Sequence, residues 1–66
     1  MLLFPVKDWE YVNRIANRLL VEAQRLKEFV ERGDFTGVWL SSVSINTLAG
    51  YLNDFVEEKR RQGWLR

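Results

Sequence analysis

The chain offers few side chains that could carry out chemistry. Its best-spaced acidic pair is Asp54 and Glu58, with Glu57 between them, and in a helix residues three or four apart lie on one face. Carboxylate oxygens in such a cluster suit a divalent cation. Arg61 follows closely, and a solvated helix surface with balanced charges explains the same pattern. We therefore predict no metal site and no bound cofactor.

Nucleophilic catalysis lacks its usual groups. The 66 residues include no His and no Cys, which removes imidazole bases, thiolate nucleophiles and disulfides. The hydroxyls of Ser41, Ser42 and Ser44 have no activating base near them in the sequence, and such clustered serines are typical of helix caps and turns. We predict that the protein is not an enzyme.

A first amphipathic helix is predicted over residues 9–32. Its apolar side chains recur at helical spacing within an arc of about 140°. Asp8 precedes this segment as a candidate N-cap, and Gly33 follows it as a candidate stop. An arc this wide is expected to contact more than one neighbouring helix. Its members are Val12, Ile15, Ala16, Leu19, Leu20, Ala23, Leu26 and Val30.

A second amphipathic helix is predicted over residues 45–62, with Ser44 as its N-cap and Gly63 as its stop. Its apolar side chains share an arc of about 160°. They are Ile45, Leu48, Ala49, Tyr51, Leu52, Phe55 and Val56. Together the two patterns predict an all-α fold, in which two long amphipathic helices pack antiparallel in a single small domain.

The remaining segments are an N-terminal apolar arm (1–7), a connector (33–43) and a C-terminal tail (63–66). The connector is longer than the usual helix–helix connection of about 2–8 residues. It is also too apolar for a free loop. We predict a short helix over residues 36–41, with a short strand as the alternative because Val38 and the residues around it are good strand formers.

Residues 35–53 form a run of 19 residues without a charge, although 29% of the whole chain is charged. A solvated surface of this length normally contains several charges, and a domain this small has little interior in which to hide it. We expect another molecule to cover the run, most simply a second copy of the chain. A homo-oligomer is therefore predicted, with an isologous dimer of helical hairpins favoured.

These features predict a small non-enzymatic protein that acts through protein–protein interaction, as a regulator or adaptor. The residues expected at the interface are apolar and either belong to the uncharged run or lie beyond the second helix. They are Phe35, Val38, Trp39, Leu40, Tyr51, Trp64 and Leu65.

A DNA-binding regulator is the alternative, with a helix-turn-helix over residues 36–55 whose second helix begins at Ser44. Asn can read adenine, and Arg can hold the phosphate backbone. The reading face has no Lys or Arg and the net charge is only +1, so counterion release would add little affinity. The residues assigned to this contact are Ser44, Asn46, Thr47, Arg60, Arg61 and Arg66.

The uncharged run does not resemble a membrane span. Seven of its 19 residues are Ser, Thr or Asn and two are Gly, whereas a spanning helix needs about 20 mostly apolar residues. The first residues lack the basic region and the cleavage site of a signal peptide. We expect a cytoplasmic protein that does not cross a membrane.

Overall fold

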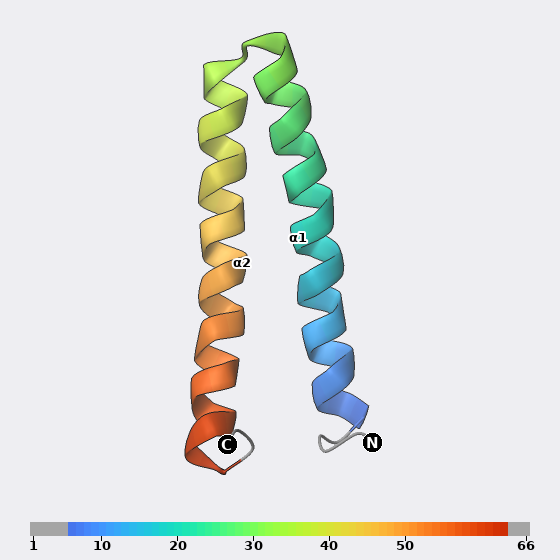
Figure 1. Cartoon of the computed structure of the whole chain (residues 1–66), viewed down its shortest axis with the longest axis vertical. Coiled ribbons are helices and arrows are strands. Elements are labelled where there is room, and N and C mark those ends of the chain that lie inside the picture. The colour runs from blue at the N-terminus through green and yellow to red at the C-terminus, as the bar shows by residue number, and fades with distance from the viewer. Residues whose placement is uncertain (1–5, 64–66) are drawn as a thin grey trace.

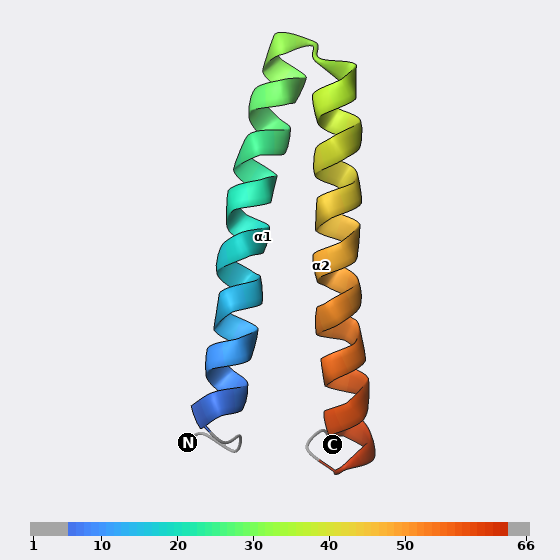
Figure 2. The ribbon, with the colours of Figure 1, turned by 180° about the vertical axis from the view of Figure 1, so that it is seen from behind.

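The computed structural model is a helical hairpin, and it describes residues 6–63. Helix α1 spans Val6–Arg32 and helix α2 spans Phe35–Arg61, and the two run antiparallel (Figure 1). Seen from behind, the same two helices lie side by side (Figure 2), in a molecule that measures 44 × 19 × 17 Å. The predicted all-helical fold, with two helices packed against each other, is confirmed. Within the described residues, neither helix has an apolar stretch long enough to cross a membrane.

The turn between the helices consists of Gly33 and Asp34. Gly33 has a φ of +69°, which glycine adopts without strain, and its N–H donates to the carbonyl of Val30 at 3.1 Å. The N–H of Asp34 donates to the carbonyl of Phe29 at 2.9 Å and satisfies a second carbonyl at the end of α1. The Asp34 carboxylate accepts a hydrogen bond from the N–H of Gly37 at 2.9 Å and caps α2. The predicted stop at Gly33 is confirmed.

The start of the second helix was predicted wrongly. Helix α2 begins at Phe35 rather than at residue 45, so the predicted connector over residues 33–43 does not exist as a separate helix or strand. Ser44 is not an N-cap, because Asp34 takes that role in front of the whole apolar run. Asp and Ser are comparable caps, so cap preference alone does not distinguish the two starts.

The hydroxyl groups that suggested a turn are accommodated inside α2. Ser42 Oγ donates to the carbonyl of Trp39 at 2.7 Å, and Thr47 Oγ1 donates to the carbonyl of Val43 at 3.0 Å. Each hydroxyl therefore bonds to the preceding turn of its own helix instead of ending it. Ser41 is only 3% exposed and lies against α1.

At the open end of the hairpin, α1 begins at Val6, so Asp8 lies in its first turn rather than at its N-cap. An acidic side chain there is favoured by the helix dipole. Its carboxylate also meets the ammonium group of Lys59 on α2 at 3.6 Å. Of the predicted arm, residues 6 and 7 are helical, and the remainder lies outside the described residues.

Helix α2 ends close to the predicted position. Its last residue is Arg61, and the N–H of Gly63 donates to the carbonyl of Arg60 at 3.0 Å. Gly63 has a φ of +87°, as expected of a glycine that follows a helix end. The predicted stop is confirmed, and the tail beyond it lies outside the described residues.

Two rows of side chains meet between the helices, and we call them the seam. Along each helix they are spaced alternately by three and four residues, the spacing that keeps a narrow stripe facing a partner helix. Every seam residue is buried or half-buried. The α1 row is Asp8, Val12, Ile15, Leu19, Glu22, Leu26 and Phe29, and the α2 row is Val38, Ser41, Ile45, Leu48, Leu52, Phe55 and Lys59.

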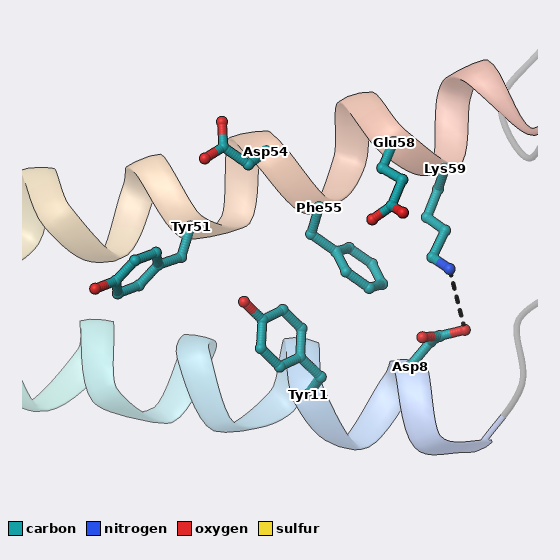
Figure 3. A pocket seen from close by; sticks show the side chains of 7 residues that line it. All are labelled: Asp8, Tyr11, Tyr51, Asp54, Phe55, Glu58 and Lys59. Atoms are coloured by element: carbon teal, nitrogen blue, oxygen red, sulfur yellow. Dashed lines mark ion pairs between the residues drawn. The ribbon is translucent and has the colours of Figure 1, made fainter.

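The seam is thin. Among the described residues, Ile15 is the only apolar side chain that is fully buried, at 6% exposed. Toward the open end, the rings of Tyr11 and Phe55 pack with their centroids 5.2 Å apart (Figure 3). Toward the turn, the ring of Phe29 lies directly on the backbone of Gly37. Two helices alone thus leave most large apolar side chains partly in water.

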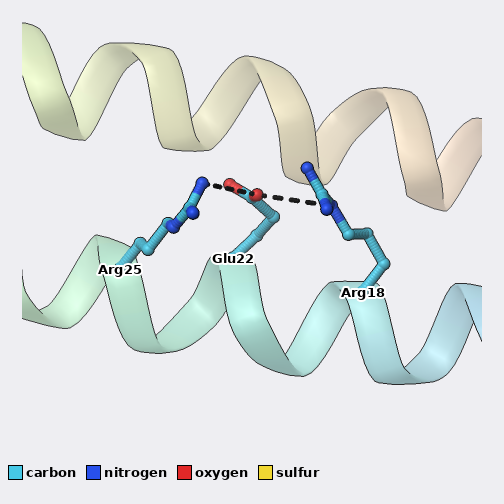
Figure 4. Close-up of polar contacts among 3 residues, drawn as sticks. All are labelled: Arg18, Glu22 and Arg25. Carbon is cyan, nitrogen blue, oxygen red and sulfur yellow. Dashed lines mark hydrogen bonds and ion pairs between the residues drawn. The ribbon is translucent and has the colours of Figure 1, made fainter.

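A charged residue occupies the middle of the seam. Glu22 is 4% exposed, and its Oε1 lies 3.6 Å from Arg18 Nε and 3.5 Å from Arg25 Nη1 (Figure 4). Both arginines belong to α1 and are themselves more than half exposed. The carboxylate is therefore desolvated by the helix packing, while its partners stay in water.

Replacing Gly37 with Ala should destabilise the hairpin. An added Cβ would overlap the Phe29 ring, and overpacking of this kind costs about 1–3 kcal/mol. Urea unfolding followed by circular dichroism measures the change. Gly50→Ala is the matched control, because nothing lies within 4 Å of a Cβ there, and it should stabilise the helix by about 0.5–1 kcal/mol. Equal stabilisation by both changes would contradict the contact.

Replacing Glu22 with Leu should leave the free energy of unfolding unchanged or raise it by up to about 2 kcal/mol. Ion pairs with exposed arginines offset little of the desolvation free energy of a buried carboxylate, and Leu fills the same position without that desolvation. The free energy of unfolding is measured for the wild type and for each variant at the same protein concentration. Glu28→Leu, at an exposed position of the same helix, should stay within about 0.5 kcal/mol of the wild type. A loss above about 1 kcal/mol at position 22 would show that the ion pairs stabilise the fold.

Candidate interaction surface

The antiparallel seam divides the rest of the hairpin surface into two flanks. In an antiparallel pair, the residues directly after each seam residue lie on one side of the hairpin in both helices. The residues directly before each seam residue lie on the other side. The grooves at the helix–helix junction agree with this geometry. The groove lined by Arg18, Arg25, Leu40 and Ser44, for example, draws preceding positions from both helices.

We call the side formed by the residues directly after the seam residues the apolar flank. The side formed by the residues directly before them is the polar flank. The apolar flank consists of Val6, Trp9, Asn13, Ala16, Leu20, Ala23, Lys27 and Val30 on α1, and of Phe35, Trp39, Ser42, Asn46, Ala49, Asn53, Val56 and Arg60 on α2. The polar flank consists of Lys7, Tyr11, Arg14, Arg18, Val21, Arg25, Glu28 and Arg32 on α1, and of Gly37, Leu40, Ser44, Thr47, Tyr51, Asp54, Glu58 and Arg61 on α2.

Charge separates the two flanks sharply. Two of the 16 residues on the apolar flank are charged, compared with nine of the 16 on the polar flank. Both charged residues of the apolar flank, Lys27 and Arg60, are basic and lie near opposite ends of the hairpin. The middle of the apolar flank consequently has no charge over about four helical turns.

Large apolar side chains are exposed on the apolar flank. Phe35 is 82% exposed, Leu20 60%, and Trp39 and Val30 59% each. On α1, Ala16 and Ala23 lie on either side of Leu20, and on α2 the small or polar side chains of Ser42, Asn46, Ala49 and Asn53 separate Trp39 from Val56. Isolated exposed apolar residues are ordinary on a protein surface, but a continuous patch on one side of a small domain is typical of a contact surface.

The positive charge at the open end of the apolar flank is balanced within α2. Arg60 Nη2 donates to Glu57 Oε2 at 2.8 Å, and Arg60 Nε donates to the same oxygen at 3.3 Å. These hydrogen bonds and the positive charge of Arg60 hold the pKa of Glu57 below its ordinary value. The pair brings little net charge to the flank.

Open grooves follow the polar flank. The groove near the open end has a volume of about 530 Å³ and is lined from both helices, by Asp8, Tyr11, Tyr51, Asp54, Phe55, Glu58 and Lys59 (Figure 3). Asp54 and Glu58 both line this groove, about one helical turn apart on α2. Within residues 6–63 no three acidic side chains come together in a way that could hold a metal ion. The grooves are shallow clefts beside the seam rather than enclosed sites.

The residues predicted at the interface are divided between surfaces. Phe35 and Trp39 lie on the apolar flank, whereas Leu40 and Tyr51 are exposed on the polar flank. Val38 is a half-buried seam residue. The last two predicted residues, Trp64 and Leu65, lie outside the described residues.

Sequence reasoning did not assign most of the apolar flank to an interface. The large exposed side chains of Leu20, Val30 and Val56, for example, were assigned to the helical arcs together with the true seam residues. The width of the α1 arc was the available signal, because one partner helix covers only a narrow stripe. Leu20 and Val30 each follow a seam residue directly, which places them beyond the reach of α2.

The residues assigned to DNA contact do not share a face. Ser44 is half-buried in a polar-flank groove and Thr47 lies on the same flank, whereas Asn46 projects from the apolar flank. Arg60 pairs with Glu57, Arg61 is exposed, and Arg66 lies outside the described residues.

The predicted helix-turn-helix is wrong in its geometry, because α2 continues without a turn through residues 42 and 43. Asp34, rather than Ser44, starts this helix, so the N-terminal turn that would approach base edges lies elsewhere in the chain.

Comparisons with known proteins supply no relative for this hairpin. No protein family model matches the chain, and no curated protein or solved structure matches it.

The ion pair on the apolar flank can be tested by titration. Glu57 should titrate with a pKa below the ordinary value of a glutamate, and Arg60→Gln should raise the pKa of Glu57 toward that ordinary value. Because the folded-state pKa is depressed, the stabilisation by this pair is present above the unfolded-state pKa and is lost as the pH falls through the folded-state pKa. The chemical shift of the Glu57 carboxyl group, followed as a function of pH, gives the pKa of Glu57 in the wild type and in each variant. Arg61→Gln is the control and should raise the pKa less, since Arg61 contributes the smallest effect. Identical shifts in the two variants would contradict the pairing.

Proposed function

We propose that this protein is a small helical regulator or adaptor that acts by binding other protein chains, self-association included, and that it catalyses no reaction. The observation that carries the proposal is the apolar flank, an exposed surface that combines aromatic and aliphatic side chains with only two charged residues among its 16. Aromatic residues with few charges around them are typical of the centre of protein–protein interfaces.

The surface area of the hairpin supports this proposal. A compact monomer of 7.9 kDa exposes about 4,400 Å². The hairpin exposes 5441 Å². The surplus, on the order of 1,000 Å², is close to the share of about 800 Å² that each partner buries in a standard interface. A contact along one flank would bring the exposed area down to that of an ordinary small domain.

The difference between the flanks supports a role as regulator or adaptor. A chain that uses its apolar flank for assembly keeps its polar flank in water. That side carries an arginine row, Arg18, Arg25 and Arg32, next to open grooves. A second protein with an acidic surface would find complementary charge there. One face then serves assembly and the other serves recognition.

Self-association should be visible by sedimentation equilibrium at micromolar concentration. The wild-type chain is expected above its monomer mass of 7.9 kDa. Trp39→Glu should shift it toward monomer, because a charge would be buried at the contact. Leu40→Glu is the matched control: the two residues are neighbours, they are 59% and 53% exposed, and they lie on opposite flanks. A wild-type monomer that unfolds cooperatively would contradict self-association.

A further inference from the structure

We infer that the apolar flank is the contact surface of an antiparallel two-fold dimer, in which two hairpins stack face to face and Leu20 packs on Leu20 of the partner subunit. The turn of each hairpin then lies over the open end of the other. This inference rests on the proposed function and deepens it, because it names the partner of the apolar flank and the residue at its centre.

The residues at mid-height of the hairpin suit a two-fold axis. Helix α1 spans Val6–Arg32 and helix α2 spans Phe35–Arg61, so Leu20 and Ala49 lie one residue past the midpoints of their helices. Both belong to the apolar flank. A two-fold axis that crosses the hairpin at the height of Leu20 brings Leu20 against its own copy and, on α2, sets Asn46 against the partner's Asn46, and overlap of the two hairpins is then close to its greatest.

Side-chain size along α1 is symmetric about the same point. Ala16 lies four residues before Leu20, and Ala23 lies three residues after it. An axis through Leu20 therefore sets each alanine against the other alanine of the partner subunit. Small residues beside the central leucine let the two helices approach to the usual distance of 8–10 Å.

Polar residues are symmetric about Leu20 as well. Asn13 lies seven residues before it and Lys27 seven residues after it. The antiparallel dimer sets the ammonium group of Lys27 against the side-chain amide of the partner's Asn13, whose oxygen can accept its hydrogen bond. The one charged residue that α1 brings to the apolar flank thus finds a polar neighbour instead of an apolar one.

The two ends of α2 also face each other in this stacking. Trp39 lies seven residues before Asn46, so about the axis it comes level with Asn53 of the partner subunit, one helical turn from the partner's Val56. The large indole of Trp39 can reach over both side chains. The exposed aromatic end near the turn is covered by the exposed aliphatic end of the other hairpin.

The alternative dimer, in which the turns of both hairpins lie at the same end, fits the residues of the apolar flank less well. In the hairpin, Leu20 and Asn46 lie at nearly the same height, as the pairing of Asp8 with Lys59 at the open end requires. A two-fold axis along the hairpin would therefore set Leu20 on the amide of the partner's Asn46. An amide without a partner in an apolar contact is costly, so the antiparallel arrangement is favoured.

The first test compares neighbouring residues on opposite flanks of the full chain. Leu20→Glu puts two carboxylates at the axis and should raise the dimer dissociation constant about 100-fold or more. Val21→Glu, on the polar flank, should change it less than about threefold. Sedimentation equilibrium measures both. If the wild type is a dimer and Leu20→Glu stays a dimer, the inference fails while the proposed function stands. A monomeric wild type would overturn both.

The second test does not depend on the glutamate variant folding. The chain has no Cys, so Leu20→Cys introduces a single thiol. Across the axis, mild oxidation should join two chains by a disulfide, whereas Val21→Cys should remain uncoupled. Spin labels on Thr36→Cys, beside the turn, should lie about 30 Å apart, twice the rise over the ten residues between position 36 and the axis at Asn46. The antiparallel dimer would be overturned if Leu20→Cys formed no disulfide between two chains. A distance below about 20 Å between the two spin labels at position 36 would overturn it as well.

Discussion

Packing between the two seam rows is the interaction on which the hairpin depends, and this packing is thin. The row on α2 contains Ser41 near the turn, and the row on α1 contains the carboxylate of Glu22 at its centre. Only Ile15 among the described apolar residues is removed from water almost completely. Apolar burial is the main favourable term in folding, so a hairpin with so little of it gains much from any partner that covers more.

The tight turn gives the flanks their different characters. Because Gly33 and Asp34 reverse the chain directly, the helices run antiparallel, and equivalent positions of both helices come to one side. Two modest amphipathic patterns therefore add up to one broad apolar surface. A longer or looser connection would allow other helix orientations, in which Leu20 and Trp39 would not share a side.

Periodicity in the sequence was enough to predict two helices, their packing and the stop at Gly33. It placed the cap of the second helix at Ser44 instead of Asp34, since Asp and Ser cap about equally well and cap preference gives no reason to prefer the earlier residue. It also placed Leu20 in the core. Which part of the wide apolar arc of α1 is covered by α2 depends on how the two helices are aligned, and the sequence of α1 alone does not determine that alignment.

The two-residue turn also governs how the chain folds. Contacts beside the turn join residues close in sequence, such as Phe29 and Gly37, and little loop-closure entropy opposes them. Each later layer of the seam is brought into reach by the layer before it, so the helices can zip together from the turn toward the open end. Local contact order of this kind goes with folding in microseconds to milliseconds. Because the seam layer at the open end closes last, we expect that layer, between Asp8 and Lys59, to open first.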